Sequence, residues 1–227
     1  MNYQDIDFNL DFGNFDPEAI QIDETINAVF IVDTSGSIVD YVKELNAAFN
    51  DFTETMQKSH IAPKLFVSIV EFSDVVRVAS GFQPISSIPK MNFGKKLGGA
   101  TKLYDGVLSG VKNALDYRSN LENSGIETKT LIFVITDGGD NASQNPPHVV
   151  KMLFDQLRAD ERSAFTFTSI LFGVGNAQEF EAAYRDMGID HLARIGTSGA
   201  EIKKMIGFIS QSISSVSAGK GGIVPTF

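Results

Sequence analysis

Short apolar runs alternate with longer amphipathic segments along most of the chain. Residues 27–32 and 130–136 are almost wholly apolar, which is typical of strands covered on both faces of a sheet. Residues 65–72 and 165–174 have the same character. Between residues 38 and 56 the apolar positions recur every three or four residues, and this spacing predicts a helix.

The remaining segments complete this alternation. Asp74 marks a turn between residues 65–72 and a second apolar run at 75–82, so the two runs are expected to form a hairpin. Further helices are predicted at residues 103–115, 146–157, 180–187 and 200–216, and a short edge strand at 191–195. The pattern predicts an α/β fold with a doubly wound, mostly parallel sheet, one antiparallel edge strand and helices on both faces.

No internal repeat or change of composition interrupts residues 25–217, which we interpret as one domain. It is preceded by an acidic arm, residues 1–24, and followed by a Gly-rich tail, residues 218–227. Hydrophobic residues make up 43% and charged residues 21% of the chain, and these ordinary globular values argue against wholesale disorder.

The net charge of −9 comes from the first part of the chain. No Lys or Arg precedes Lys43, whereas residues 1–42 contain nine acidic residues and the rest of the chain is balanced. Because no concentrated basic face is present, we expect no binding to nucleic acid.

Cysteine is absent, which excludes disulfides, thiolate zinc sites and a cysteine nucleophile. No apolar run approaches the roughly 20 residues of a membrane helix. The first ten residues lack the basic and apolar parts of a secretory signal. We therefore expect a cytoplasmic protein that does not bind membranes.

Residues 5–12 alternate between polar and apolar side chains, with Phe8 and Phe12 on one side. This period of two predicts a half-buried strand, and an acidic disordered arm is the alternative. Since a lone strand is unstable in water, it would pair with this domain's own sheet or with a second molecule, and the latter would give self-association.

Three polar clusters lie where ligands bind in open α/β sheets, beyond the carboxyl ends of the strands and before the helices that follow. Asp33, Ser35 and Ser37 follow the first strand. Thr101 precedes a helix, and Asp137 follows the most apolar strand. Their hydroxyl and carboxylate oxygens are the hard ligands that Mg²⁺ prefers.

Each cluster also has a structural alternative. Serine and threonine hydroxyls cap helices, so Ser35, Ser37 or Thr101 could be N-caps, and Asp137 could belong to a simple turn. Asp105 and Asp140 are interpreted as solvated or capping residues. No Gly-x-Ser-x-Gly elbow surrounds the serines, which argues against a hydrolase nucleophile.

The order Asp-x-Ser-x-Ser, a later Thr and then Thr-Asp-Gly resembles the metal-ion-dependent adhesion site (MIDAS) of von Willebrand factor A (VWA) domains. The matching residues are Asp33, Ser35, Ser37, Thr101 and Asp137, and the resemblance covers residues 25–217. It implies a Rossmann-like fold and bound Mg²⁺, with Mn²⁺ or Ca²⁺ as alternatives. It also implies a non-enzymatic module whose metal takes a carboxylate from an exposed Asp or Glu of a partner protein.

The resemblance further implies an intracellular bacterial type, working beside stress-response or ATPase machinery, and a final helix able to shift on binding. Two other functions remain open. One is a secreted or surface adhesin. The other is a metal-dependent phosphoester hydrolase with Asp33 as nucleophile, although no acidic residue stands two positions later.

Overall fold

The computed structural model describes residues 24–159, 166–175 and 179–219. Its strands are β1 (Glu24–Asp33), β2 (Leu65–Phe72), β3 (Val76–Pro84), β4 (Glu127–Thr136), β5 (Phe167–Val174) and β6 (His191–Ile195). Its α-helices are α1 (Val42–Gln57), α2 (Leu103–Asn123), α3 (Pro147–Ala159), α5 (Glu179–Met187) and α6 (Gly199–Ser217). Short 3₁₀ helices are η2 (Gly36–Asp40), η3 (Ala62–Lys64) and η4 (Ile85–Ser87). Within these ranges no helix has both the length and the apolar character needed to cross a membrane.

The six strands form one sheet in the order β3-β2-β1-β4-β5-β6. All neighbours are parallel except β2 and β3, so the predicted fold class with its antiparallel edge is confirmed. The chain leaves β1 towards β2 and leaves β4 towards β5, in opposite directions across the sheet. The strand order therefore reverses between β1 and β4, where open α/β sheets form their ligand crevice.

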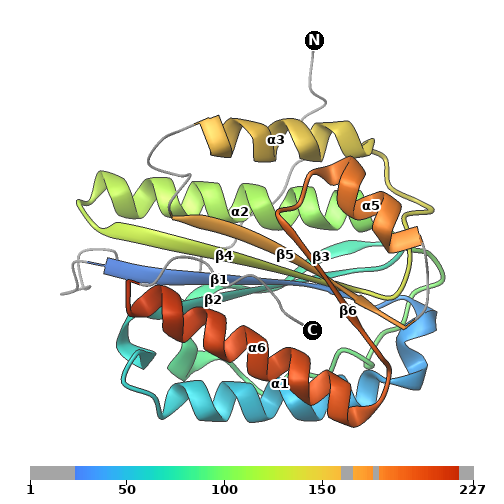
Figure 1. Cartoon of the computed structure of the whole chain (residues 1–227), viewed down its shortest axis with the longest axis horizontal. Coiled ribbons are helices and arrows are strands. Elements are labelled where there is room, and N and C mark those ends of the chain that lie inside the picture. The colour runs from blue at the N-terminus through green and yellow to red at the C-terminus, as the bar shows by residue number, and fades with distance from the viewer. Residues whose placement is uncertain (1–23, 160–165, 176–178, 220–227) are drawn as a thin grey trace.

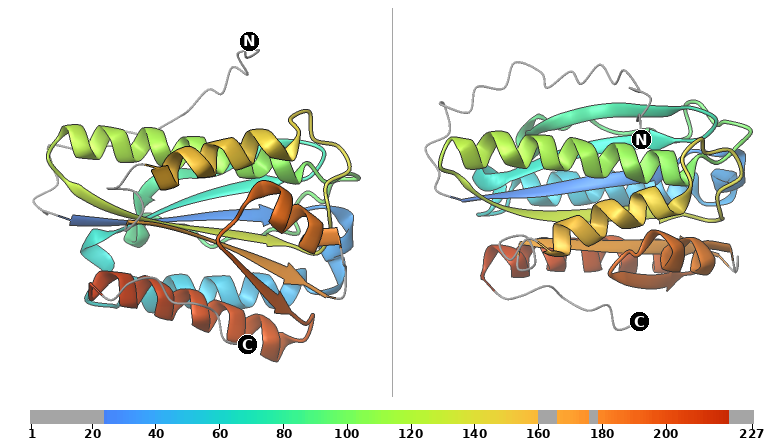
Figure 2. Two further views of the ribbon diagram at one scale, coloured as in Figure 1. Left: turned by 45° about the horizontal axis from the view of Figure 1, so that its top comes forward. Right: turned by 90° about the horizontal axis from the view of Figure 1, so that it is seen from above.

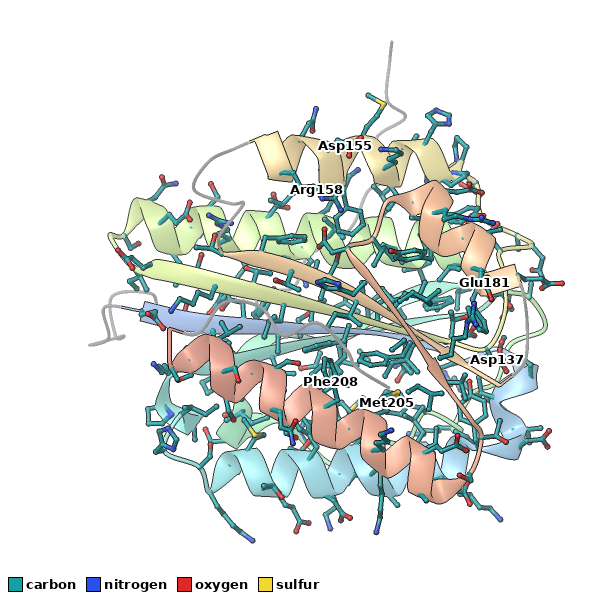
Figure 3. All side chains as sticks on the ribbon, viewed as in Figure 1. Asp137, Asp155, Arg158, Glu181, Met205 and Phe208 are labelled. Atoms are coloured by element: carbon teal, nitrogen blue, oxygen red, sulfur yellow. The ribbon has the colours of Figure 1, made fainter. Side chains whose placement is uncertain are left out.

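Helices cover both faces of the sheet, with α2, α3 and α5 on one side and α1 and α6 on the other (Figures 1 and 2). Phe30 lies in the interface between the sheet and helices α1 and α6. Its ring centroid is 5.0 Å from that of Phe49 and 5.3 Å from that of Phe133. Met205 and Phe208 of α6 lie against the same face (Figure 3). The predicted apolar stripe of α6 is buried, so this helix is part of the core.

The structure differs from the sequence pattern at element boundaries. The stripe from 38 to 56 is not one helix, because η2 ends at Asp40 and Tyr41 leaves helical geometry with φ −132° before α1 begins. Strands β1 and β4 begin three residues earlier than predicted, since their first residues are polar yet paired in the sheet. The arm and the tail fall almost wholly outside the described residues, so the strand at 5–12 stays a prediction.

Two glycines let α2 approach the sheet closely. A Cβ atom on Gly106 would lie 2.8 Å from Cγ of Phe72, and one on Gly110 would lie 2.4 Å from Cδ1 of Ile31. Both distances are well below van der Waals contact. The start of α2 is consequently held against the end of β2, next to the carboxyl ends of the central strands.

Replacing Gly106 by Ala should therefore destabilise the protein by about 1–3 kcal/mol, because the added methyl group meets the rigid Phe72 ring. Gly207→Ala in α6 is the matched control, since nothing lies within 4 Å of its would-be Cβ. This second change should stabilise the protein by up to about 1 kcal/mol through helix propensity. Urea unfolding measures both, and equal effects would contradict the close packing of α2.

Candidate metal site

Asp33 ends β1 and ties the loop that follows β1 to the end of β4. Its side chain is only 1% exposed. Its Oδ1 accepts a hydrogen bond from the Ser35 backbone N–H at 2.8 Å, and its Oδ2 accepts one from the Thr136 hydroxyl at 2.7 Å. Both oxygens of this buried carboxylate are thus held in place by the two central strands and their loops.

Ser35 and Ser37 connect the loop after β1 to Asp137 through their side chains. The Oγ atoms of Ser35 and Ser37 lie 3.0 Å apart, and the Ser37 hydroxyl donates to Oδ1 of Asp137 at 2.8 Å. Asp137 lies at the end of the sheet where the central strands finish (Figure 3). The fold therefore brings four of the five predicted site residues into one hydrogen-bonded chain across the crevice.

Thr101 reaches the same place on a third loop. The Gly98 N–H donates to the Thr34 carbonyl at 3.0 Å, which places this loop beside the one that follows β1. A side chain on Gly98 would collide with Ser73, at 2.5 Å from its Cβ, so this approach requires glycine. The backbone of Thr101 exchanges two hydrogen bonds with Asn141, one of 2.8 Å to its Oδ1 and one of 3.0 Å from its N–H. Thr101 therefore lies between the loops that follow β1 and β4.

The N-cap residues of η2 and of α2 make no side-chain capping hydrogen bond. Ser35 is the N-cap residue of η2, but its side chain makes no capping hydrogen bond. The N-cap residue of α2 is Lys102, not Thr101. Thr101 is 8% exposed, and no hydrogen bond of its hydroxyl is found among the described residues, so this oxygen is available to a ligand.

Sequence reasoning missed the side chains that position these residues. Thr136 orients Asp33, and Asn141 holds Thr101. Asp105 accepts hydrogen bonds from the loop that follows β4, and Asp140 accepts one from the Tyr104 N–H at 3.3 Å. Asp140 caps the start of α2, as the sequence suggested, whereas Asp105 anchors the loop that follows β4. The cluster of Asp, Asn and Ser at 137–145 was the only sequence signal for this anchoring.

The two carboxylates create an uncompensated negative field. Burial raises the pKa of Asp33 to about 6, against the opposing effect of its hydrogen bonds, and the charge of Asp137 adds to the shift. Burial also raises the pKa of Asp137. The Tyr41 hydroxyl is buried without a hydrogen-bond partner, and burial together with both carboxylates raises its pKa. No ion pair found in the described part of the chain involves Asp33 or Asp137, so a cation would relieve this field.

The donor set fits a small hard cation. Adjacent ligands of an octahedral Mg²⁺ ion at about 2.1 Å lie about 3.0 Å from each other. The Oγ atoms of Ser35 and Ser37 have this separation, 3.0 Å. The described residues contain no group of three or more His, Asp or Glu suited to a metal, so a site here depends on hydroxyl ligands.

The sequence matches a known family over most of its length. Residues 27–198 match the model of the von Willebrand factor type A domain, which is more than half of the chain. The chain belongs to the VWA domain family. No curated protein matches its sequence.

Several solved structures share the VWA fold. Proximal thread matrix protein 1 from the mussel byssus, described with a zinc-occupied MIDAS motif, is 18% identical with a TM-score of 0.58, over 85% of this chain and 48% of its own. The pilus adhesin SpaC from Lactobacillus rhamnosus GG is 13% identical with a TM-score of 0.64, over 84% and 30%. The ArnB paralog VWA2 from Sulfolobus acidocaldarius is 15% identical with a TM-score of 0.52, over 83% and 44%. At these identities the likeness shows the fold, and this chain spans less than half of each structure.

The raised pKa of Asp33 predicts an unusual pH dependence in the metal-free VWA domain. Between its ordinary value of 3.8 and about 6, the folded protein keeps a proton that the unfolded chain has released. The contribution of protonated Asp33 to the free energy of unfolding is therefore complete below this pH range and is lost as the pH rises through it. Asp33→Asn removes the effect. In chelator, the wild type should lose about 2–3 kcal/mol more unfolding free energy than this variant between about pH 4 and pH 8. Parallel pH profiles would contradict the buried, uncompensated carboxylate.

Proposed function

We propose that this VWA domain is a non-enzymatic binding module that holds a divalent ion and, through it, a carboxylate of a partner protein. Ser35, Ser37 and Thr101 would hold the ion, with Asp33 and Asp137 mainly in outer positions. The observation that carries the proposal is the 3.0 Å separation of the two serine hydroxyls, with both carboxylates behind them. Mg²⁺ is the preferred ion, and Mn²⁺, Ca²⁺ or the Zn²⁺ of the mussel protein are alternatives.

Each residue has a distinct part in such a site. The hydroxyl ligands carry no charge, so a bound cation would keep its affinity for an incoming acid. Asp33 fixes the Ser35 backbone, and Asp137 accepts a hydrogen bond from the Ser37 hydroxyl, which leaves a lone pair of that oxygen free for an ion. When bound, the ion would supply the electrophilic position that a partner's Asp or Glu occupies.

The surroundings of the site suit a partner that combines an acidic residue with apolar neighbours. Val39 is 59% exposed and lies in η2 two residues after Ser37, while Leu97 is 38% exposed beside Gly98. Lys95 and Lys96 precede Leu97 and are exposed. This exposed apolar rim, made of Val39 and Leu97, favours a protein ligand over a free ion or a small acid.

A hydrolase mechanism is less well supported. Asp33 would have to attack a phosphoester, yet it is 1% exposed and both of its oxygens accept hydrogen bonds. The cytoplasmic location and the link to stress-response or ATPase complexes stay predictions of the sequence. The surface-adhesin alternative rests on the likeness to a pilus adhesin.

We expect a partner retained on the immobilised protein in Mg²⁺ to be released by chelator. Thr101→Ala should abolish this retention by removing a metal ligand, while Thr55→Ala, an exposed threonine of α1, should not. Leu97→Asp should weaken partner affinity at least about tenfold by placing a charge in the rim. Met152→Asp is its control, because Met152 is 51% exposed on α3, away from the site loops.

Affinity of the captured partner, measured by calorimetry in Mg²⁺ and in chelator, decides the outcome. Full affinity of Thr101→Ala, or unchanged affinity in chelator, would overturn the metal-dependent mechanism. Equal losses for Leu97→Asp and Met152→Asp would instead show that the rim is not the docking face.

A further inference from the structure

The start of α2 is capped by the loop that follows β4 rather than by its own N-cap residue. Lys102, the N-cap residue, makes no side-chain capping hydrogen bond. Instead, the Tyr104 N–H donates to Oδ1 of Asp140 at 3.3 Å, and the Asp105 N–H donates to Oγ of Ser143 at 3.0 Å. Since the first N–H groups of a helix find no acceptor within the helix, this loop supplies what α2 lacks.

Hydrogen bonds also run in the opposite direction, from the loop to α2. The Asp105 carboxylate accepts from the backbone N–H groups of Gln144 at 2.9 Å and of Asn145 at 3.0 Å. Its Oδ1 also accepts a bond of 2.8 Å from Nδ2 of Asn145. The loop and the first turn of α2 therefore cap each other, and a movement of one against the other would break several hydrogen bonds.

Asn141 extends this contact to Thr101, just before α2. Its Oδ1 accepts from the Thr101 N–H at 2.8 Å, and its backbone N–H donates to the Thr101 carbonyl at 3.0 Å. Both backbone polar groups of Thr101 are thus held by one residue, and neither bond uses the Thr101 hydroxyl. Asn141 itself is exposed, so its side chain is not part of the core.

The position of Thr101 matters because a small hard cation requires nearly ideal geometry, with ligands of Mg²⁺ at about 2.1 Å in octahedral directions. Ser37 is fixed to Asp137 by its own hydrogen bond, whereas Thr101 comes from a separate loop. Asn141 lies four residues after Asp137 on one segment of the chain. It therefore links Thr101 to the segment that also carries Asp137.

We propose that Asn141 is a positioning residue of the metal site, which raises the affinity for the ion by holding the Thr101 backbone in place. This inference rests on the proposed function, because it concerns the same ion. Asn141 is not itself a ligand and acts through Thr101. Removing such an outer residue typically weakens metal binding by about 10–100-fold.

Three variants of the full chain test this role, with Mn²⁺ alone as the probe. Asn141→Ala removes the acceptor of the Thr101 N–H and should weaken Mn²⁺ binding at least about tenfold. Asn141→Asp keeps an acceptor oxygen at the same place, so its affinity should lie no more than about threefold below that of the wild type. Asn145→Ala is the matched control and should also stay within about threefold, because this side chain contacts Asp105 and not Thr101.

A second readout needs no metal. In chelator, the Thr101 amide hydrogen should exchange with solvent at least about tenfold faster in Asn141→Ala than in the wild type, Asn141→Asp or Asn145→Ala. Melting temperatures show that all three variants fold. Amide exchange followed by NMR and calorimetric titration with Mn²⁺ give the two results independently.

The outcomes separate this inference from the proposed function. A wild type that binds no Mn²⁺ would overturn both. Wild-type binding that Asn141→Ala retains in full would overturn the positioning role alone, as would an unchanged Thr101 exchange rate in that variant. Equal losses of affinity in Asn141→Ala and Asn145→Ala, or no rescue by Asn141→Asp, would also contradict it.

Discussion

Strands β1 and β4 run side by side through the centre of the sheet, in a register that pairs Glu24 with Glu127 and Val32 with Ile135. This register places Asp33 opposite Thr136 and allows their hydrogen bond of 2.7 Å. Because the chain turns away from β1 and β4 in opposite directions, no helix crosses the space beyond their ends. The loops that carry the serines and Asp137 consequently meet there.

The central strands have polar residues at their ends and an apolar middle. Between Ala28 and Val32 every side chain of β1 is buried and apolar, so the two faces of the sheet can each pack a layer of helices. Their carboxyl ends present the hydroxyl and carboxylate oxygens of the proposed metal site. Their amino ends present buried hydroxyls with no partner, next to Arg118 and a cavity.

Strand and helix types were predictable because burial on both faces gives apolar runs and burial on one face gives helical periodicity. The break in the helix at Tyr41 could not be predicted in this way. Ile38 belongs to η2, yet its position continues the apolar spacing of α1. The starts of β1 and β4 were missed for a related reason, since Thr25 and Thr128 look like loop residues but are buried.

Within the metal site, short motifs with local spacing were visible in the sequence, whereas their supports were not. Asp33 and Ser35 are two residues apart, and such a pattern can be recognised directly. Asn141 holds Thr101 across 40 residues of chain, and only the folded structure reveals such a contact. The glycine at 98 is likewise explained only by the position of Ser73.

The central claim is that the crevice between β1 and β4 holds a divalent ion on hydroxyl ligands. Anomalous diffraction from crystals grown with Mn²⁺ tests it most directly, because the ion itself is located. The account predicts one strong peak at about 2.0–2.3 Å from Oγ of Ser35 and of Ser37, with Thr101 as a third protein ligand. A peak coordinated directly by Asp33 without the serines, or an empty crevice with Mn²⁺ bound elsewhere on the domain, would contradict it.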